Sequence, residues 1–420
     1  MSRAPALGLL RERTFRRFWT GQTASLFGDQ ISLLAIPLTA VLVLHAGAAQ
    51  MGFLTAAGVL PSLLFSIAAG VRIDRSARRR QIMLVADVLR AVLLLTVPAA
   101  FLLGLLSLAH LYVVTFAIGT LDVFFFVAYT TLFVAIVPAD RYVEGNSLLN
   151  GARAMSFVGG QSLAGLLVAV FTAPGALFLD ALSFLGSAWS LSRIRPTEPD
   201  PAPPEPAPLR AGARFIRDSP IVRAALGATA TVNFFTFIFS AIFVLYATEN
   251  LHIRPVELGV VLGAGAIGGL IGAAITTTIS RRIGIGPAFI VSCLLFPAPL
   301  LLVPLAPQHH SVALVLLFLA EFGSGMGVMI LDISVGSLFA AVIPDQLRAR
   351  VAGAYRTINY GVRPLGAIAG GLLGQAIGLP ATLWIATAGA LLNILWTLPG
   401  PLRHLRTLPA AAQPQPEPSR

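Results

Sequence analysis

The sequence is organised as long apolar runs separated by short polar breaks. Twelve of these runs reach about 20 residues, which is the length a helix needs to cross a hydrocarbon core of about 30 Å. The breaks carry most of the arginines and many of the glycines and prolines. The expected spans are 17 to 44, 49 to 71, 81 to 104, 108 to 137, 144 to 172, 175 to 194, 221 to 248, 256 to 279, 286 to 306, 311 to 342, 350 to 376 and 380 to 399.

These runs predict helices, because a lipid-exposed segment must satisfy its own backbone hydrogen bonds and the alternation typical of a barrel strand is absent. A proline-rich break from 196 to 208 divides the spans six and six. The expected fold is therefore all-α and membrane-spanning, with two six-helix halves. The expected organisation is a first half at 1–194, a Pro-rich cytoplasmic linker at 195–219 with a polyproline-type stretch at 196–208, a second half at 220–402 and a disordered tail at 403–420.

Composition supports a membrane protein. Of the 420 residues, 56% are hydrophobic and only 11% are charged, with a mean hydropathy of +0.83. The net charge of +11 comes entirely from arginine clusters between apolar runs, which favours topology and lipid contact over nucleic-acid binding. A single cysteine and the absence of lysine argue against a disulfide, a cysteine metal site and an ATP-binding loop, and no metal or cofactor is expected.

The arginines also predict orientation. They mark the N-terminus, the C-terminal end and every second junction, whereas the intervening turns have almost none. By the positive-inside rule both termini are expected in the cytoplasm, with the chain in the plasma membrane and with no cleavable signal peptide.

The two halves repeat at an offset of 206 residues. The pair Gly160 and Gly165 matches Gly366 and Gly371, and Arg75 matches Arg281 at corresponding junctions. Such matches indicate duplicated halves, and the glycines are expected at close helix contacts.

The polar elbow from Gly70 to Arg80 has one acid among five arginines. It resembles the loop signature of the major facilitator superfamily, in which Gly70, Asp74, Arg75, Arg78 and Arg79 match and Ala77 replaces a glycine. The segments at 18–19, 21–22, 28–29 and 35–38 are further similar to macrolide-efflux and enterobactin-exporter-like permeases. The resemblance implies secondary transport by alternating access.

The elbow has two physical interpretations. Gly70 is expected to let helices approach closely, and Asp74 to pair with an arginine across the halves as a cytoplasmic gate. In the alternative interpretation the arginines only fix topology, and Arg72 and Arg80 are assigned to that class.

Ionisable residues inside the spans are candidates for function, because charge is costly in hydrocarbon. Burial disfavours a charged carboxyl, which suits a proton carrier. The residues expected in the coupling site or substrate cavity are Asp29, Glu321, Asp122, Asp332, Arg363 and Gln22.

The other polar residues have simpler explanations. Asp87 and Arg90 are spaced for a local ion pair, and Asp180 is expected to meet water or a donor on another helix. The aromatic runs at 124–133 and 234–243 could line a drug site, but lipid contact is the simpler expectation.

The resemblance implies proton-coupled efflux of an amphipathic small molecule, such as a macrolide-like compound or a siderophore, by a monomer. Uptake or facilitated diffusion of a metabolite is the alternative within transport. A sensor or scaffold is a further alternative, and no pattern of catalytic groups indicates an enzyme.

Overall fold

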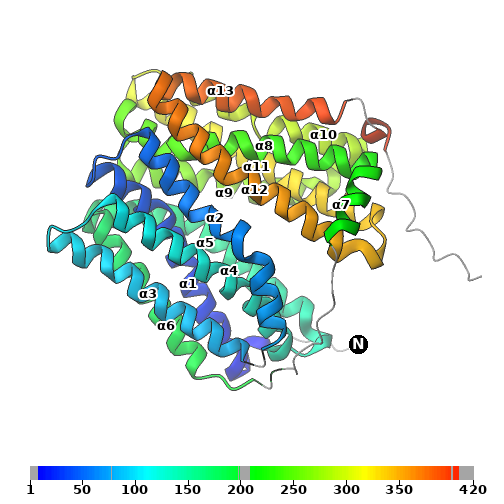
Figure 1. The fold of residues 1–420 in the computed structure, drawn as a ribbon, viewed down its shortest axis with the longest axis horizontal. Helices are drawn as coiled ribbons and strands as arrows, with labels where there is room; N and C mark the ends of the chain where they lie inside the picture. Colours follow the sequence, from blue (N-terminus) through cyan, green and yellow to red (C-terminus); the bar gives the residue numbers. More distant parts are fainter. Residues whose placement is uncertain (1–7, 77, 197, 199–208, 399–400, 406–420) are drawn as a thin grey trace, which may run out of the picture.

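We describe the protein from a computed structural model, which covers residues 8–76, 78–196, 198, 209–398 and 401–405. The described residues are helical almost throughout, and each of the twelve expected runs contains an α-helix (Figure 1). The helices are α1 (Arg13–Leu42), α2 (Ala48–Asp74), α3 (Arg79–Leu102), α4 (Leu108–Ile136), α5 (Tyr142–Phe171), α6 (Ala173–Ser192), α7 (Leu209–Asp218), α8 (Pro220–Leu245), α9 (Pro255–Ile283), α10 (Ile285–Leu295), α11 (His310–Val342), α12 (Asp345–Ile377) and α13 (Leu379–Leu391).

Eleven described helical segments are long and apolar enough to cross a membrane. The 33-residue helix α12 is not among them, because Arg356, Asn359 and Arg363 lower its hydropathy. The ninth and twelfth runs each change helix type before they end: α10 gives way to the 3-10 helix Ala298–Leu302, and α13 continues as the 3-10 helix Leu392–Trp396. Pro297 and Pro299 explain the first change, since proline cannot donate the backbone hydrogen bond of a helix interior.

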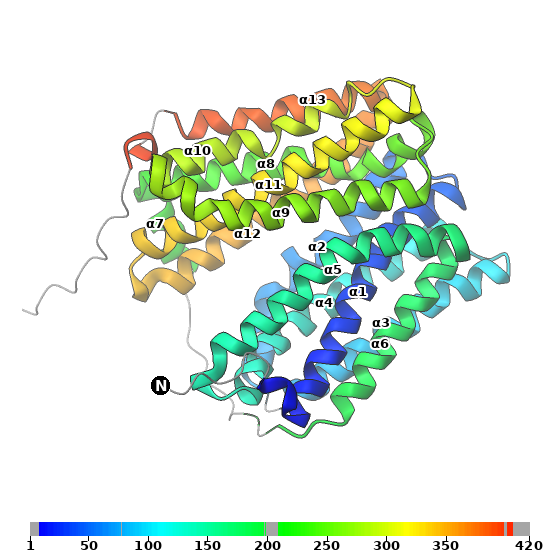
Figure 2. The ribbon, with the colours of Figure 1, turned by 180° about the vertical axis from the view of Figure 1, so that it is seen from behind.

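The helices form two bundles. In the first, α1 packs on α5 and α6, and α4 packs on α2 and α3; in the second, α8 packs on α12 and α13, and α11 packs on α9 and α10. The main contacts between the bundles are α2 with α12 and α5 with α9. Figures 1 and 2 show the bundles together at one end and diverging towards the end that carries α7.

Glycine backbones make both of these main contacts between the bundles. A Cβ added to Gly52 of α2 would lie 2.7 Å from the Cα of Gly371 in α12, and one added to Gly259 of α9 would lie 3.0 Å from the Cα of Gly165 in α5. No side chain fits at these distances, so the helices meet through their backbones. Because α12 repeats α5 and α9 repeats α2, the two contacts are related by the internal repeat.

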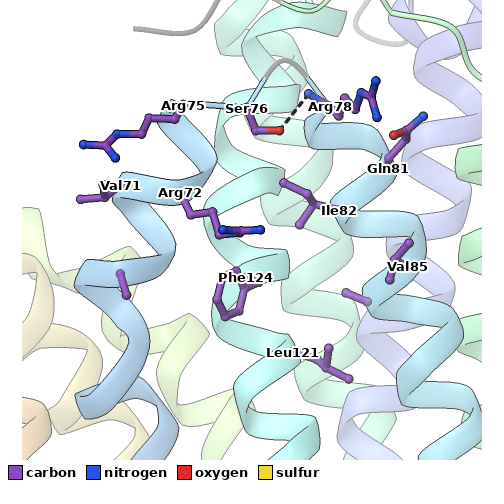
Figure 3. Close-up of a pocket in the computed structure, with 12 residues that line it drawn as sticks. Val71, Arg72, Arg75, Ser76, Arg78, Gln81, Ile82, Val85, Leu121 and Phe124 are labelled. Carbon is purple, nitrogen blue, oxygen red and sulfur yellow. Dashed lines mark hydrogen bonds between the residues drawn. The ribbon is translucent and has the colours of Figure 1, made fainter. Parts of the chain in front are cut away.

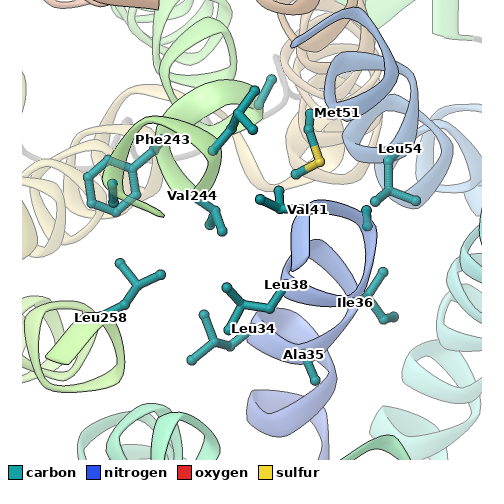
Figure 4. Close-up of a cluster of buried hydrophobic side chains, with 14 of the residues drawn as sticks. Leu34, Ala35, Ile36, Leu38, Val41, Met51, Leu54, Phe243, Val244 and Leu258 are labelled. Carbon is teal, nitrogen blue, oxygen red and sulfur yellow. The ribbon is translucent and has the colours of Figure 1, made fainter. Parts of the chain in front are cut away.

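Apolar side chains fill the space around these glycines. Leu34 and Leu38 of α1 and Met51 of α2 belong to one buried cluster with Phe243 of α8 and Leu258 of α9 (Figure 4). This cluster spans both bundles and closes the end at which they meet.

The turns repeat as well. His45 after α1 and His252 after α8 both have positive φ, at 51° and 52°. Thr172, between α5 and α6, has φ 67° and ψ 166°, and Gly378 at the repeated position has φ 85° and ψ 159°. This backbone region is almost confined to glycine, so Thr172 is strained where Gly378 is not.

Both connecting segments contain ordered structure that the sequence did not indicate. Within the expected linker, residues 209–218 form α7, whose buried Ile216 and partly buried Phe215 belong to one apolar cluster with Val351 of α12. The expected tail is ordered at its start, where the Gly286 amide donates to the Leu405 carbonyl at 3.0 Å. The rest of the expected tail, 406–420, and most of the polyproline segment, at 197 and 199–208, lie outside the described residues.

We predict that Gly371→Leu lowers the stability of the folded protein, because its side chain would collide with the backbone of α2. Overpacking of this kind costs about 1 to 3 kcal/mol. Thermal unfolding in detergent checks this, with Gly151→Leu as the matched control, since a Cβ at Gly151 meets no described atom within 4 Å. Equal melting temperatures for both variants would contradict the packing role.

We predict that Thr172→Gly stabilises the protein by about 1 kcal/mol, because it removes the strain of a β-branched residue in a glycine region. The reciprocal change, Gly378→Thr, should lower the melting temperature in the same assay. A loss of stability in Thr172→Gly would show that the contacts of the threonine side chain stabilise the fold by more than the backbone strain destabilises it.

Candidate functional site

A buried arginine lies at the centre of the first bundle. Arg90 of α3 is 2% exposed, and its guanidinium forms ion pairs with Asp122 Oδ1 of α4 at 2.5 Å and with Asp87 Oδ1 at 3.3 Å. The guanidinium carbon also lies over the rings of Phe125 and Phe184, at 4.4 and 5.2 Å from their centroids. The expected local pair of Asp87 and Arg90 is confirmed, but Asp122 makes the shorter contact.

Two more carboxyl groups surround this cation. Asp180 of α6 is fully buried and accepts hydrogen bonds from Ser183 Oγ at 3.0 Å and from Ser32 Oγ of α1, which confirms the expected donor on another helix. Gly28 leaves room for it, since a Cβ there would collide with the Asp180 carboxylate. The next residue, Asp29, lies within electrostatic reach of Asp122 and Arg90.

We call Asp29, Asp87, Arg90, Asp122 and Asp180 the Arg90 cluster. One guanidinium cannot balance four carboxylates, and no described group hydrogen-bonds to Asp87 Oδ2. The side chain of Asp122 is 50% exposed, which makes it the most accessible member of its ion pair with Arg90. Protons or a cationic ligand at these carboxyls would therefore complete the charge balance.

The second bundle holds a different polar site. Arg363 Nε of α12 donates to Asn233 Oδ1 of α8 at 3.1 Å, and Asn233 Nδ2 donates to Asn359 Oδ1 at 3.0 Å. The chain continues through Thr229 to the Tyr355 hydroxyl, at 2.6 Å. Asp332 of α11 is exposed and lies within electrostatic reach of Arg363.

Glu321 of α11 is isolated from these groups. Its Oε2 would lie 3.4 Å from a Cβ added to Gly265 of α9, so the carboxyl rests against a glycine surface. Within the described part of the chain, no hydrogen bond or ion pair engages this carboxyl. Gln22 of α1 is also buried, and no described group is paired with its Nε2.

The four repeated glycines all lie at close helix contacts. Gly165 and Gly371 join the two bundles. Within the bundles, a Cβ at Gly160 would meet the Gln30 side chain of α1 at 2.7 Å, and one at Gly366 would collide with the Phe234 backbone of α8.

The elbow between α2 and α3 differs from expectation at Gly70. A Cβ there would meet no described atom within 4 Å, so Gly70 does not serve a close helix contact in this conformation. Arg75 and Arg78 are exposed, and Arg79 is 3% exposed. Asp74 ends α2, but its side chain lies outside the described part of the structure.

The elbow is tied to the segment after α6. The Glu198 carboxylate accepts from the backbone amides of Arg79 and Arg80 at 2.5 and 3.1 Å, which places a negative charge at the N-terminus of α3. The Arg80 guanidinium donates to the Ile194 carbonyl at 2.8 Å. Arg80 therefore has a structural role, and its assignment to topology alone is wrong.

The aromatic runs are less exposed than expected from lipid contact. Phe125, Phe239 and Phe243 are buried, and the last two stack with centroids 5.0 Å apart. Phe126 is 52% exposed. The run in α4 thus divides between the bundle interior and the molecular surface.

This architecture defines a polytopic helical membrane protein with charged groups in its interior. The family model described as Major Facilitator Superfamily matches residues 18–367, and the chain belongs to that family. Members of the family are transporters and not enzymes, so no catalytic centre is assigned.

Curated relatives extend over most of the chain. The multidrug efflux pump Tap of Mycolicibacterium fortuitum is 27% identical, over 92% of this chain and 95% of that protein. Tap of Mycobacterium tuberculosis is 26% identical, over 84% and 85%. These identities establish similarity to the pumps over most of the chain.

Solved structures agree on the fold. A point mutant of the nucleoside transporter NupG superimposes with a TM-score of 0.74 at 12% identity, over 92% of this chain and 99% of that one. A bacterial homologue of the iron transporter ferroportin, in an inward-facing state, gives 0.71 at 20% identity, over 92% and 98%.

We predict that Arg90→Leu strongly destabilises the protein, by about 3 to 5 kcal/mol, because it leaves buried carboxylates without their cation. Lowering the pH should recover part of the loss, since protonation neutralises the carboxylates. Thermal unfolding across a pH series checks this, with the exposed Arg153→Leu as control. A pH-independent loss would assign Arg90 to packing alone.

Proposed function

We propose that this chain is a proton-coupled exporter of amphipathic small molecules that works by alternating access. The Arg90 cluster is the observation that carries this proposal. An isolated structural ion pair needs one acid for one base, whereas this cluster has four acids around one arginine. Such an excess favours groups that take up and release protons during a cycle.

Asp122 connects the cluster to the substrate path in this proposal. Its carboxylate is half-exposed and bound to Arg90, and Asp29 lies nearby on α1. A proton or a cationic substrate at Asp122 would weaken its pairing with Arg90, so the two ligands would compete for one carboxylate. Competition of this kind is the simplest basis for exchange of protons against a substrate.

Glu321 and Arg363 extend the proposed path to the second bundle. Glu321 offers a carboxyl with no described partner, which suits a second proton site. Arg363 lies 4.5 and 5.4 Å from the ring centroids of Tyr360 and Phe237, and these rings offer a surface for flat apolar compounds. Gln22 and Asp332 would add polar contacts on the same path.

The moving units in this proposal are the two bundles, at 1–194 and 220–402. Backbone contacts at Gly52 with Gly371 and at Gly165 with Gly259 would act as the pivots. With both termini in the cytoplasm, the diverging end would face inward, and Asp74 with Arg75, Arg78 and Arg79 would close it in the opposite state. One chain contains both bundles, so a monomer in the plasma membrane is sufficient.

The similarity to Tap supports efflux of several compounds and not of a single metabolite. The relatives named as multidrug efflux pumps cover most of the chain. Macrolide-like compounds and siderophores remain the first classes to offer as substrates.

The proposal is tested by reconstitution in liposomes with an imposed pH gradient, following internal pH and compound movement together. We predict that Asp122→Asn and Asp29→Asn remove proton-driven accumulation but keep downhill movement of the compound, because the cavity is intact. Glu321→Gln should weaken coupling in the same way.

Asp218→Asn is the matched control, since this acid is 58% exposed and lies outside both bundles' interiors. Compound movement that ignores the pH gradient in the unchanged protein would contradict coupling and favour facilitated diffusion. No movement of any compound, with the protein folded, would contradict transport and favour a sensor or scaffold.

A further inference from the structure

A basic pocket of about 1020 Å³ lies between α2, α3 and α4 beside the elbow. Arg72 and Arg75 of α2 and Arg78 of α3 line it, and below them it is mostly apolar. In Figure 3, Arg72 reaches across the pocket above Phe124, while Arg75 and Arg78 mark its two upper edges. The proposed transport cycle assigns no role to Arg72.

Among the described residues, no carboxylate balances the positive charges around this pocket. None of the described lining residues is acidic, and no described carboxylate lies within salt-bridge distance of Arg72, Arg75 or Arg78. Ser76 and Gln81 add neutral polar groups at the same level, and Ser76 Oγ accepts from the Arg78 amide at 3.1 Å. Charge complementarity therefore favours binding of an anion at the end of the pocket next to the elbow.

The deeper part of the pocket is suited to binding a hydrocarbon chain. Ile82 and Val85 of α3 and Leu121 and Phe124 of α4 line it, and Val85 is 52% exposed. These residues continue along the helices from the elbow into the spans, so one ligand could place its charge at the arginines and its chain along the apolar wall.

The pocket opens on an outer face of the first bundle. Both α2 and α3 pack on α4, and Figures 1 and 2 show the row α2, α4 and α3 on one face and the row α5, α1 and α6 on the other. A groove on an outer face of a membrane bundle meets lipid, and basic pockets at the interface bind anionic lipid headgroups.

We propose that this pocket binds an anionic glycerophospholipid, with its phosphate at Arg72 and Arg78 and an acyl chain against Val85, Leu121 and Phe124. The lipid would join α2 to α3 at the elbow, next to the segment that closes the diverging end in the proposed cycle. Lipid binding at this pocket requires only that the protein is inserted in a membrane. The proposal is therefore tested independently of the compounds that are transported.

The test measures binding of a fluorescent phosphatidylglycerol to the delipidated protein in neutral detergent. Arg72→Gln with Arg78→Gln should weaken binding about thirtyfold, since each arginine near an anionic headgroup contributes about fivefold. Unlabelled phosphatidylglycerol should displace the probe, whereas phosphatidylcholine should do so poorly. Val85→Asn should weaken lipid binding through the acyl chain.

Arg281→Gln with Arg282→Gln is the matched control, because it removes two exposed arginines from the corresponding elbow of the second bundle. It should leave the affinity unchanged. Equal weakening in both double variants would overturn the site, as would unchanged binding in Arg72→Gln with Arg78→Gln. Displacement of the probe by inorganic phosphate as well as by lipid, with no effect of Val85→Asn, would show a simple anion site and overturn the lipid assignment.

Discussion

The close approach of glycine backbones at two repeated sites is the constraint on which the rest of this structure depends. Gly52 meets Gly371, and Gly259 meets Gly165, at distances that admit no side chain. Both contacts lie at one end of the bundles, where Leu34, Phe243 and Leu258 complete an apolar seal. The other end is then free to diverge, and a protein with two such related contacts can pivot without unfolding either bundle.

The charged residues, unlike the helix contacts, do not repeat between the two bundles. The second contact pair repeats the first, but the Arg90 cluster has no counterpart at the repeated positions, where Phe235, Val328 and Phe296 replace Asp29, Asp122 and Arg90. The second bundle instead contains the hydrogen-bonded chain from Arg363 to Tyr355. Duplicated packing with unlike polar interiors is what a transporter needs if the halves share a hinge but handle different ligands.

The sequence predicted the fold well, because membrane burial imposes one pattern on every span and the arginines interrupt it at regular junctions. It identified Asp29 and Asp122 as unusual but missed that Arg90 joins α3 to α4, since helix rotation decides which side chains meet. It also missed α7, whose Phe215 and Ile216 are too few to stand out beside the prolines. The prediction that Gly70 lies at a close helix contact was wrong for a related reason. A glycine in a motif does not show whether a neighbouring helix is close.

The most direct test of the account is a pair of distances between spin labels in a Cys293→Ser background. One pair, Asn146→Cys with Arg282→Cys, joins α5 to α9 at the diverging end. The other, Phe171→Cys with Arg254→Cys, joins the end of α5 to the residue before α9, on the opposite side of the contact between Gly165 and Gly259. We expect that changing pH or adding a transported compound shortens the first distance and lengthens the second, because the bundles rock about the glycine contacts. Distances that both stay fixed, or both change in the same direction, would contradict alternating access about these pivots.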